Sequence, residues 1–430
     1  MTTQAEQARA RIAKLETEID LQREVLRNLE NDKRLAQRYL NTILDPLTRL
    51  PLEISSEIFL QTLDTPFPEP GALRVPMLLL SICHAWTDIA LSTSALWAAI
   101  DIFFSGTQGL KELLPIWFGR AQNRPLSISL GGGRFDQDIT SVIWSHRQRL
   151  KHLEIVDVDG DVQSEMGVRS LWGGTSLGPL PSLRTLTIRG MGVWVEDDEL
   201  SPEPFSLRHI LELLRLSPDL IECLFSQMEF FDDVDANEIL VLPKLRRLRF
   251  EGPSTHPHFG GVALKHLSLP GLEVLSASLP DRDVDDNLFS FLKRSSPPLR
   301  ELISHSETLD PVHLVAYLSL IPDLRRFELQ NTLGQVKEEL LAVLADSPSL
   351  VPHLTTVVIH LHPISDSFWT ALLRPLAARP TQVFHLMVPF RLSASQMPAP
   401  DLIAAFKKLA VDGPRVIVKA ILEPWEHAFD

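Results

Sequence analysis

Hydrophobic residues recur every three or four positions along the first part of the chain. The pattern fits heptads over residues 5–43, in which ten of the twelve a and d positions are apolar and only Gln22 and Lys33 are polar. The a positions are Ala5, Ile12, Ile19, Leu26, Lys33 and Leu40, and the d positions are Ala8, Leu15, Gln22, Leu29, Ala36 and Ile43. Such a pattern is typical of a coiled-coil helix. Because a lone helix leaves this stripe in water, we expect self-association or packing on the chain's own body.

A segment of closely spaced apolar residues follows this helix. Pro46 ends the helix, and Leu50-Pro51 opens the next one, where a proline costs no hydrogen bond. The proline-rich loop 64–71 is not expected to be helical. A second helix is predicted over Met77–Ala90, and a short third element over 96–100. Such a small helical unit has more apolar residues than its own core needs, which indicates a partner.

Four motifs follow one another in this segment, namely Leu50-Pro51-Leu52-Glu53-Ile54, Ile58-Phe59 with Leu63, Ser81-Ile82-Cys83-His84-Ala85-Trp86, and Ile89-Ala90 with Leu96-Trp97. Taken in this order, they resemble the F-box. The F-box usually shows a Leu-Pro-x-Glu-Ile start, a Val-Cys-Arg/Lys-x-Trp centre and a Leu-Trp close. Here Ser55 stands where Leu or Ile is common, and His84 replaces the usual basic residue. The placement after a heptad helix is similar to that of many fungal F-box proteins.

The resemblance implies that this module docks on a Skp-type adaptor, which joins a cullin ligase core. The candidate residues for that surface or its support are Leu50, Pro51, Ile54, Ile58, Phe59, Cys83 and Trp86. The motifs do not divide these residues between interface and core. We therefore expect a substrate-recognition adaptor of an SCF-type cullin E3 ubiquitin ligase, and not an enzyme. The alternative is a repeat-containing protein-interaction scaffold without ligase function.

The remainder of the chain repeats one phrase, in which a leucine precedes two further apolar residues at the fourth and sixth positions. The first leucines stand at positions 150, 183, 220, 245, 272, 299, 324 and 354. This spacing is similar to that of irregular leucine-rich repeats. Helical patterns lie between the phrases, at 207–216, 287–293, 312–321, 338–344 and 368–376.

These patterns predict an α+β repeat protein in three parts. A long helix occupies residues 1–44, and a small three-helix F-box-like module occupies residues 45–104. Residues 105–430 are expected to form a leucine-rich-repeat-like α/β solenoid with a parallel sheet. A stack of βα units without curvature is the alternative.

Strand residues that alternate with the inward-pointing apolar ones are expected to line the open face of that sheet. They are Glu154, Thr187, Leu224, Arg249, Ser268, Ser276, Ile303, Glu328 and Val358, flanked by Arg247, Arg326 and His360. From this set we expect Glu154, Thr187, Arg247, Arg249, Arg326, Glu328 and His360 to contact a target protein. The basic residues of 244–249 and of 325–326 suit either an acidic or phosphorylated partner or local ion pairs with Glu251 or Glu328.

Composition and charge narrow the function further. Of 430 residues, 44% are hydrophobic and 22% charged, as in a folded protein, and the net charge of −14 argues against nucleic acid and anionic membranes as partners. Two cysteines provide no disulfide framework and fit a reducing compartment. The N-terminus lacks a secretory apolar core, and no run of residues is long and apolar enough to span a membrane. We therefore expect an intracellular protein, cytoplasmic or nuclear.

The sequence contains short matches to catalytic, phosphate-binding and metal-binding motifs, but each lacks a feature that its motif requires. The G-x-S-x-G match at 174–178 is followed at once by prolines, so the helix of a nucleophile elbow cannot begin there. The triple glycine 131–133 lacks the Lys-Ser/Thr of a P-loop. The pairs His256/His258 and His360/His362 have no clear third ligand. We expect no catalytic residue, no metal and no cofactor.

Overall fold

The structure is a computed structural model of the whole chain. It describes residues 2–63, 74–104, 109–132, 136–156, 178–190, 205–228, 230–231, 233–235, 238–251, 260–277, 287–305, 311–330, 334–347, 349–360, 366–378, 383–388, 399–409 and 416–420.

Two compact units make up the chain. The first consists of Met1–Asp101 with Glu112–Ile128, and the second of Ile102–Lys111 with Ser129–Asp430. Each unit is described by itself below.

A single long helix, α1 (Thr2–Leu44), opens the first unit and confirms the predicted helix over the heptads. The helix ends just before Pro46, as predicted. Asp45 then caps the short 3-10 helix η1 (Pro46–Arg49), where its carboxylate accepts a hydrogen bond from the backbone N–H of Leu47 at 2.9 Å.

Three short helices and a 3-10 turn follow in the first unit. They are α2 (Leu52–Leu60), α3 (Arg74–Ile82), α4 (His84–Ser92) and η2 (Ser94–Trp97), and with η1 we call them the helical module. The predicted single helix over Met77–Ala90 is wrong, because Cys83 adopts an extended conformation and caps α4 with its Sγ. Ile100 lies in strand β1 (Ala99–Phe103), outside the helical module.

Helix α5 (Leu110–Arg120) adds a layer to the core of the first unit. Trp117 packs edge-on against Trp97 with the ring centroids 4.8 Å apart, and the guanidinium of Arg120 lies 4.4 Å above the Trp97 ring. Trp97 Nε1 donates a hydrogen bond to the carbonyl of Ala90 at 2.9 Å. Both tryptophan side chains are fully buried, so this edge-to-face pair closes the core beside α4.

The second unit is built on a parallel sheet whose strands pair in chain order. From β3 onward the order is β3-β4-β6-β9-β11-β12-β13-β14-β15-β16. Strands β1 and β2 (Leu126–Gly131) precede β3 in the same sheet, and the boundary between the two units falls within each of these two strands. Every pair from β3 to β16 is parallel. The strands are β3 (Leu150–Val156), β4 (Thr185–Arg189), β6 (Glu222–Ser226), β9 (Arg247–Glu251), β11 (Val274–Ala277), β12 (Glu301–His305), β13 (Arg326–Gln330), β14 (Thr356–His360), β15 (Val383–Val388) and β16 (Val416–Ala420).

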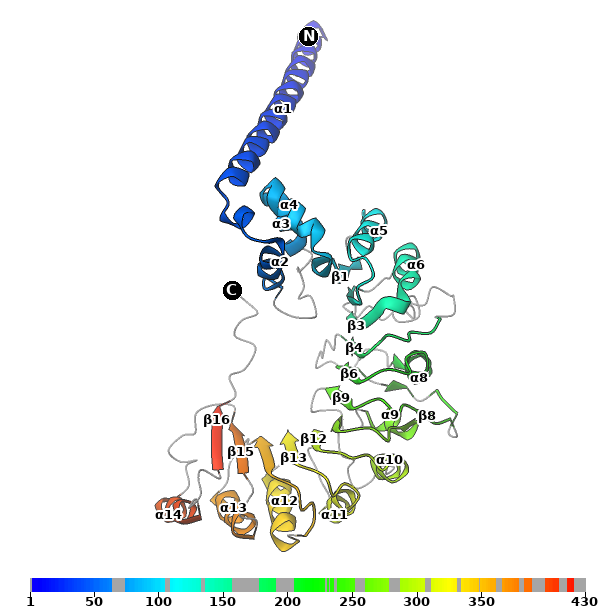
Figure 1. Cartoon of the computed structure of the whole chain (residues 1–430), viewed down its shortest axis with the longest axis vertical. Coiled ribbons are helices and arrows are strands. Elements are labelled where there is room, and N and C mark those ends of the chain that lie inside the picture. The colour runs from blue at the N-terminus through cyan, green and yellow to red at the C-terminus, as the bar shows by residue number, and fades with distance from the viewer. Residues whose placement is uncertain are drawn as a thin grey trace. The chain divides into compact units, whose positions relative to one another are not determined.

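Helices lie along one side of these strands (Figure 1). They are α6 (Gln137–Ser145), α8 (Leu207–Arg215), α9 (Gly261–Lys265), α10 (Asn287–Ser295), α11 (Pro311–Ser319), α12 (Gly334–Asp346), α13 (Asp366–Ala378) and α14 (Pro400–Leu409). Five of them confirm the helical patterns predicted between the repeated phrases. In α8, Leu207, Ile210 and Leu214 recur at helical spacing and are buried.

The repeated apolar residues fall into register across the sheet and form its core. The fourth residues of the eight phrases pair in one buried row, which runs Leu153, Leu186, Cys223, Leu248, Leu275, Leu302, Phe327 and Val357, and Phe384 of β15 continues it. An α/β fold with a long N-terminal helix and a large parallel sheet is therefore confirmed.

Two features of the second unit depart from the predictions. Ser268 lies in β10 (Leu267–Ser268), which pairs with β8 (Leu240–Val241) in a separate two-stranded sheet, so its assignment to the open face is wrong. Strands β15 and β16 were not predicted, although Val383–Val388 alternates in the same way as the earlier phrases. Within the described ranges, no helix combines the length and apolarity needed to cross a bilayer.

Candidate protein-binding surfaces

An exposed apolar surface on α2 is the first candidate site. Leu50, Leu52, Ile54 and Ile58 are 41% to 51% exposed, and Pro51 is exposed with them. Ile54 and Ile58 are four residues apart and share one face of α2. Four of the seven candidate adaptor-binding residues therefore face solvent. Because large aliphatic side chains on one small helix are costly to leave in water, this face suits a protein partner.

The other three candidates support this surface from behind. Phe59 and Cys83 are buried, and the ring of Trp86 lies 4.9 Å from that of Phe59. The Sγ of Cys83 accepts a hydrogen bond from the backbone N–H of Trp86 at 3.5 Å. Trp86 Nε1 donates to the carboxylate of Asp45. These contacts join η1, α2 and α4 into one core. Phe59 and Cys83 therefore support the exposed face from within, and the partly buried Trp86 links that core to the cap of η1.

The two departures from the F-box pattern have different structural outcomes. Ser55 is fully buried, and its Oγ donates toward the carbonyls of Leu47 at 3.3 Å and Pro51 at 3.2 Å. It therefore holds η1 against α2 and is not part of the exposed apolar face. His84 is exposed at the first position of α4.

The open face of the parallel sheet is the second candidate site. With Ser268 removed, the predicted residues pair in a single row that runs Glu154, Thr187, Leu224, Arg249, Ser276, Ile303, Glu328 and Val358. The predicted residue Arg247 lies two positions before Arg249 in β9, and Arg326 lies two positions before Glu328 in β13. Since alternate strand residues share a face, both belong to the same face as the row.

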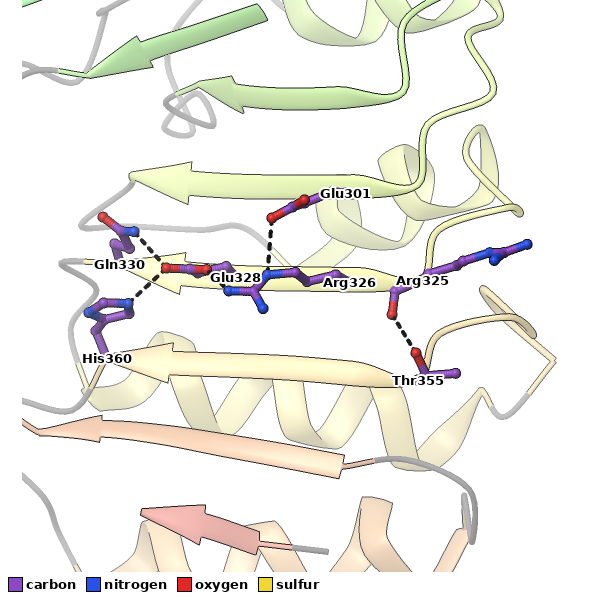
Figure 2. Close-up of polar contacts among 7 residues, drawn as sticks. All are labelled: Glu301, Arg325, Arg326, Glu328, Gln330, Thr355 and His360. Carbon is purple, nitrogen blue, oxygen red and sulfur yellow. Dashed lines mark hydrogen bonds and ion pairs between the residues drawn. The ribbon is translucent and has the colours of Figure 1, made fainter. Parts of the chain in front are cut away.

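Glu328 is the centre of the most connected polar cluster on this face (Figure 2). Its carboxylate accepts hydrogen bonds from Arg326 Nη2 at 2.6 Å, Gln330 Nε2 at 2.7 Å and His360 Nε2 at 2.9 Å. Arg326 Nε also lies 3.0 Å from the carboxylate of Glu301. Burial by itself raises the pKa of Glu328, but the bonds from His360, Gln330 and Arg326 outweigh it and lower the pKa to about 2.

Ion pairs also join neighbouring repeats at the N-terminal ends of the strands. Arg247 lies 3.6 Å from Glu222, its register partner in β6, and Glu273 lies 3.7 Å from Arg246 and 3.6 Å from Arg300. Lys244 pairs with Asp219. Local ion pairs are thus confirmed for Arg326 with Glu328, whereas Lys244, Arg246 and Arg247 find acidic partners other than Glu251.

Two arginines differ from this paired majority. Among the residues that the structure describes, the side chain of Arg249 makes no hydrogen bond or ion pair, although its Nε is buried. The side chain of Arg325, which is exposed, also makes no hydrogen bond or ion pair with the described residues. It points away from the Glu328 cluster, while its carbonyl accepts a hydrogen bond from Thr355 Oγ1 at 3.1 Å (Figure 2). Arg249 lies between Leu224 and Ser276 in the row, where it can meet an acidic group.

His305 and Gln330 also lie on this face but were not predicted from the sequence. His305 Nε2 lies 2.7 Å from Ser276 Oγ, and Gln330 supports Glu328. Both follow the row residue of their strand by two positions, as His360 does, and they pair with each other in register. Applying strand alternation to this position would have found them. Burial lowers the pKa of His305, with smaller effects from Glu328 and His360.

The described residues form no metal-binding group of three or more His, Cys, Asp or Glu side chains. Burial raises the pKa of the Cys223 thiol, which removes it as a nucleophile. Residues 174–177 of the G-x-S-x-G match, the pair His256/His258 and His362 lie outside the described residues. Comparison with known protein families and with curated proteins finds no match to this chain.

Proposed function

We propose that this chain is an F-box protein that recruits substrates to an SCF-type cullin E3 ubiquitin ligase. The observation that carries the proposal is the exposed aliphatic set Leu50, Ile54 and Ile58 on a module whose motif residues Phe59 and Cys83 are buried behind it. This division between display and support is what a docking module needs, since the interface must be apolar and held rigidly. Pro51 and Leu52 extend the exposed set.

The parallel sheet is the proposed binding surface for the target protein. Its strands pair in chain order with a helix between most neighbours, which supports a leucine-rich-repeat-like solenoid over the described strands. The proposed contact residues are Glu154, Thr187, Arg247, Arg249, Arg326, Glu328 and His360. Arg249 is the first choice for an acidic or phosphorylated group of the target, because it lacks a partner among the described residues. In this reading the chain acts inside the cell, in cytoplasm or nucleus, and catalyses nothing itself.

Adaptor capture by the purified chain tests the proposal. Ile54→Glu with Ile58→Glu places two charges on the exposed face and should lower the affinity for a Skp-type adaptor at least about 100-fold, or ~3 kcal/mol. Both side chains are half exposed, so the fold should tolerate the change. Ile116→Glu is the matched control, because Ile116 of α5 is equally exposed and lies outside the motifs.

Three results are decisive. Loss of adaptor binding in the double variant alone supports the docking role of α2. Failure of the unaltered chain to bind the adaptor removes the ligase assignment and leaves a repeat scaffold. Equal loss in Ile116→Glu would mean that binding does not depend on the motif face.

A further inference from the structure

The heptad stripe of α1 is open to solvent over its described length. Seven of its large apolar residues are 49% to 60% exposed, namely Ile12, Leu15, Ile19, Leu26, Leu29, Leu40 and Ile43. They share one face of the helix by their a and d spacing. An exposed apolar stripe of this length indicates a protein-binding surface.

The contacts that hold α1 to the helical module leave this stripe uncovered. Arg38 Nη2 donates to the carbonyl of Leu80 at 2.8 Å and to Thr87 Oγ1 at 3.1 Å. Asn41 Nδ2 lies 3.4 Å from the carbonyl of Ile82. In the heptad frame Arg38 is at f and Asn41 at b, which lie opposite the a and d positions. In the first unit, therefore, the heptad stripe does not pack on the helical module.

Charges beside the stripe are complementary to those of a second, parallel copy. In a parallel pair a residue at g faces the residue at e five positions later in its partner. Arg11 at g then meets Glu16 at e, and Glu18 at g meets Arg23 at e. Each pair occurs twice by symmetry. Among the described residues of the monomer, Arg23 pairs only with the exposed Asp20 of the same helix, at 3.3 Å, and such an exposed pair is a weak competitor.

An antiparallel pair of fully overlapped stripes gives the opposite result. Residues at e then face e, and residues at g face g. Glu16 would face Glu30, Glu18 would face Asp32, and Arg23 would face its own copy. Like charges at these positions oppose association. The flanking charges therefore select the parallel orientation.

The two polar residues of the stripe select register. In a parallel pair without offset, Gln22 faces Gln22 of the partner and the two amides can hydrogen-bond to each other. A slip by one heptad places Gln22 against Leu15 and Leu29, which leaves a buried amide unpaired. Lys33 faces its own copy at a cost in stability, and Asp32 at the neighbouring g position provides the compensating charge.

We propose that α1 forms a parallel, in-register coiled coil with a second copy of this chain. The dimer carries both helical modules at the same end of the coiled coil, because both α1 helices end at Leu44. The proposal does not depend on what the helical module binds. If the module docks an adaptor, each dimer presents two docking sites, and a target with two epitopes gains avidity.

Sedimentation of the full chain at micromolar concentration tests the dimer. The unaltered chain should sediment at twice its mass of 48.3 kDa. Leu26→Glu with Leu29→Glu alters one a and one d position and should give the monomer. Leu21→Glu with Leu35→Glu is the matched control, since both leucines are equally exposed but at c positions. A monomeric unaltered chain, a trimer, or equal dissociation in both variants would overturn the proposal.

A charge exchange tests the orientation. Arg11→Glu with Arg23→Glu makes every flanking pair acidic, and Glu16→Arg with Glu18→Arg makes every flanking pair basic. Each variant alone should dimerise about 100-fold more weakly than the unaltered chain. Mixed in equal amounts, the two variants restore all the opposite-charge pairs and should form the heterodimer. Absence of the heterodimer would contradict the parallel pairing of g with e.

A cysteine at position 36 provides an independent measure of orientation. Ala36 is a d position, so Ala36→Cys places two thiols face to face in the proposed dimer and should give a disulfide-linked chain under mild oxidation. In the antiparallel dimer Ala36 faces Ile12, and the two thiols are separated by about 36 Å, or 24 residues at 1.5 Å each. The natural Cys83 and Cys223 are buried and do not interfere. A dimer that fails to cross-link would refute the parallel register.

Discussion

The helical module and the sheet face present opposite kinds of surface. On the module, apolar side chains such as Ile54 and Ile58 are exposed, while the polar groups behind them are bonded internally. On the sheet face, charged side chains project among polar and apolar ones, and nearly all the charged ones that are described already have partners within the chain. The apolar surface of the helical module therefore remains uncovered among the described residues, whereas most charges of the sheet face are paired within the chain.

The exposed apolar face is expected to contribute mainly affinity for a partner, and the face of paired charges mainly selectivity between partners. An exposed aliphatic face gains free energy from any complementary apolar groove, at about 25 cal/mol per Å² of apolar surface that is buried. A face of paired charges gains little unless a ligand replaces the internal partners with equally good ones. A module of the first kind suits a constant partner, and a face of the second kind suits a partner chosen among many.

The largest expected effect comes from removing the support of the module. Phe59→Ala deletes a buried ring that packs on Trp86, and it should lower the free energy of unfolding of the first unit by about 3–5 kcal/mol. Ile54→Ala, five residues earlier in the same helix, should change it by less than about 0.5 kcal/mol because the side chain is already half exposed. Urea unfolding followed by circular dichroism measures both values. Similar losses at the two positions would mean that α2 does not have separate display and support faces.

The sequence predicted the elements better than it predicted their faces. Heptad spacing determines α1, and the repeated leucine phrase determines the strands, because both patterns record burial against a regular backbone. Cys83 shows where this fails. An apolar pattern continued through it, but an extended backbone at Cys83 divides α3 from α4. Its Sγ makes a local capping contact with the N–H of Trp86 and a tertiary contact with Asp45, and the apolar pattern records neither.

The candidate residues show the same limit. Strand alternation placed Glu154 through Val358 in one row, and it misplaced only Ser268, whose local pattern is that of a strand but whose partner strand is β8. Motif position did not distinguish Ile58 from Phe59, which are adjacent in sequence and opposite in exposure. Which strand pairs with which, and which helix face is covered, depend on residues far away in the chain.

An intermediate effect is expected from the Glu328 cluster as pH falls. The folded state holds the pKa of Glu328 at about 2, below its ordinary value of 4.5, so the carboxylate stabilises the fold above pH 4.5 and loses that contribution as pH falls toward 2. A shift of this size corresponds to about 3 kcal/mol. Glu328→Gln should therefore destabilise the second unit by up to about 3 kcal/mol at neutral pH and by much less near pH 2.

The unfolding free energies of the variant and the unaltered chain, compared at neutral and acid pH, provide the measurement. The same change at the exposed Glu212 of α8 is the control, and it should cost less than about 0.5 kcal/mol at neutral pH. A deficit in Glu328→Gln that persists unchanged into acid would show that the lost stability comes from packing and not from the charge of the carboxylate.

The smallest expected effect lies at the edge of the same face, in the pair Glu222–Arg247. Its side chains are 34% and 56% exposed and 3.6 Å apart, so solvent screening leaves a coupling of less than about 0.5 kcal/mol. A double-mutant cycle with Glu222→Ala and Arg247→Ala measures that coupling, and high salt should abolish it. The cycle distinguishes two roles for the edge. A coupling near zero leaves Arg247 available to contact the proposed target. A salt-resistant coupling above about 1 kcal/mol would make the edge as structural as the Glu328 cluster, and would confine the proposed target contact to residues such as Arg249.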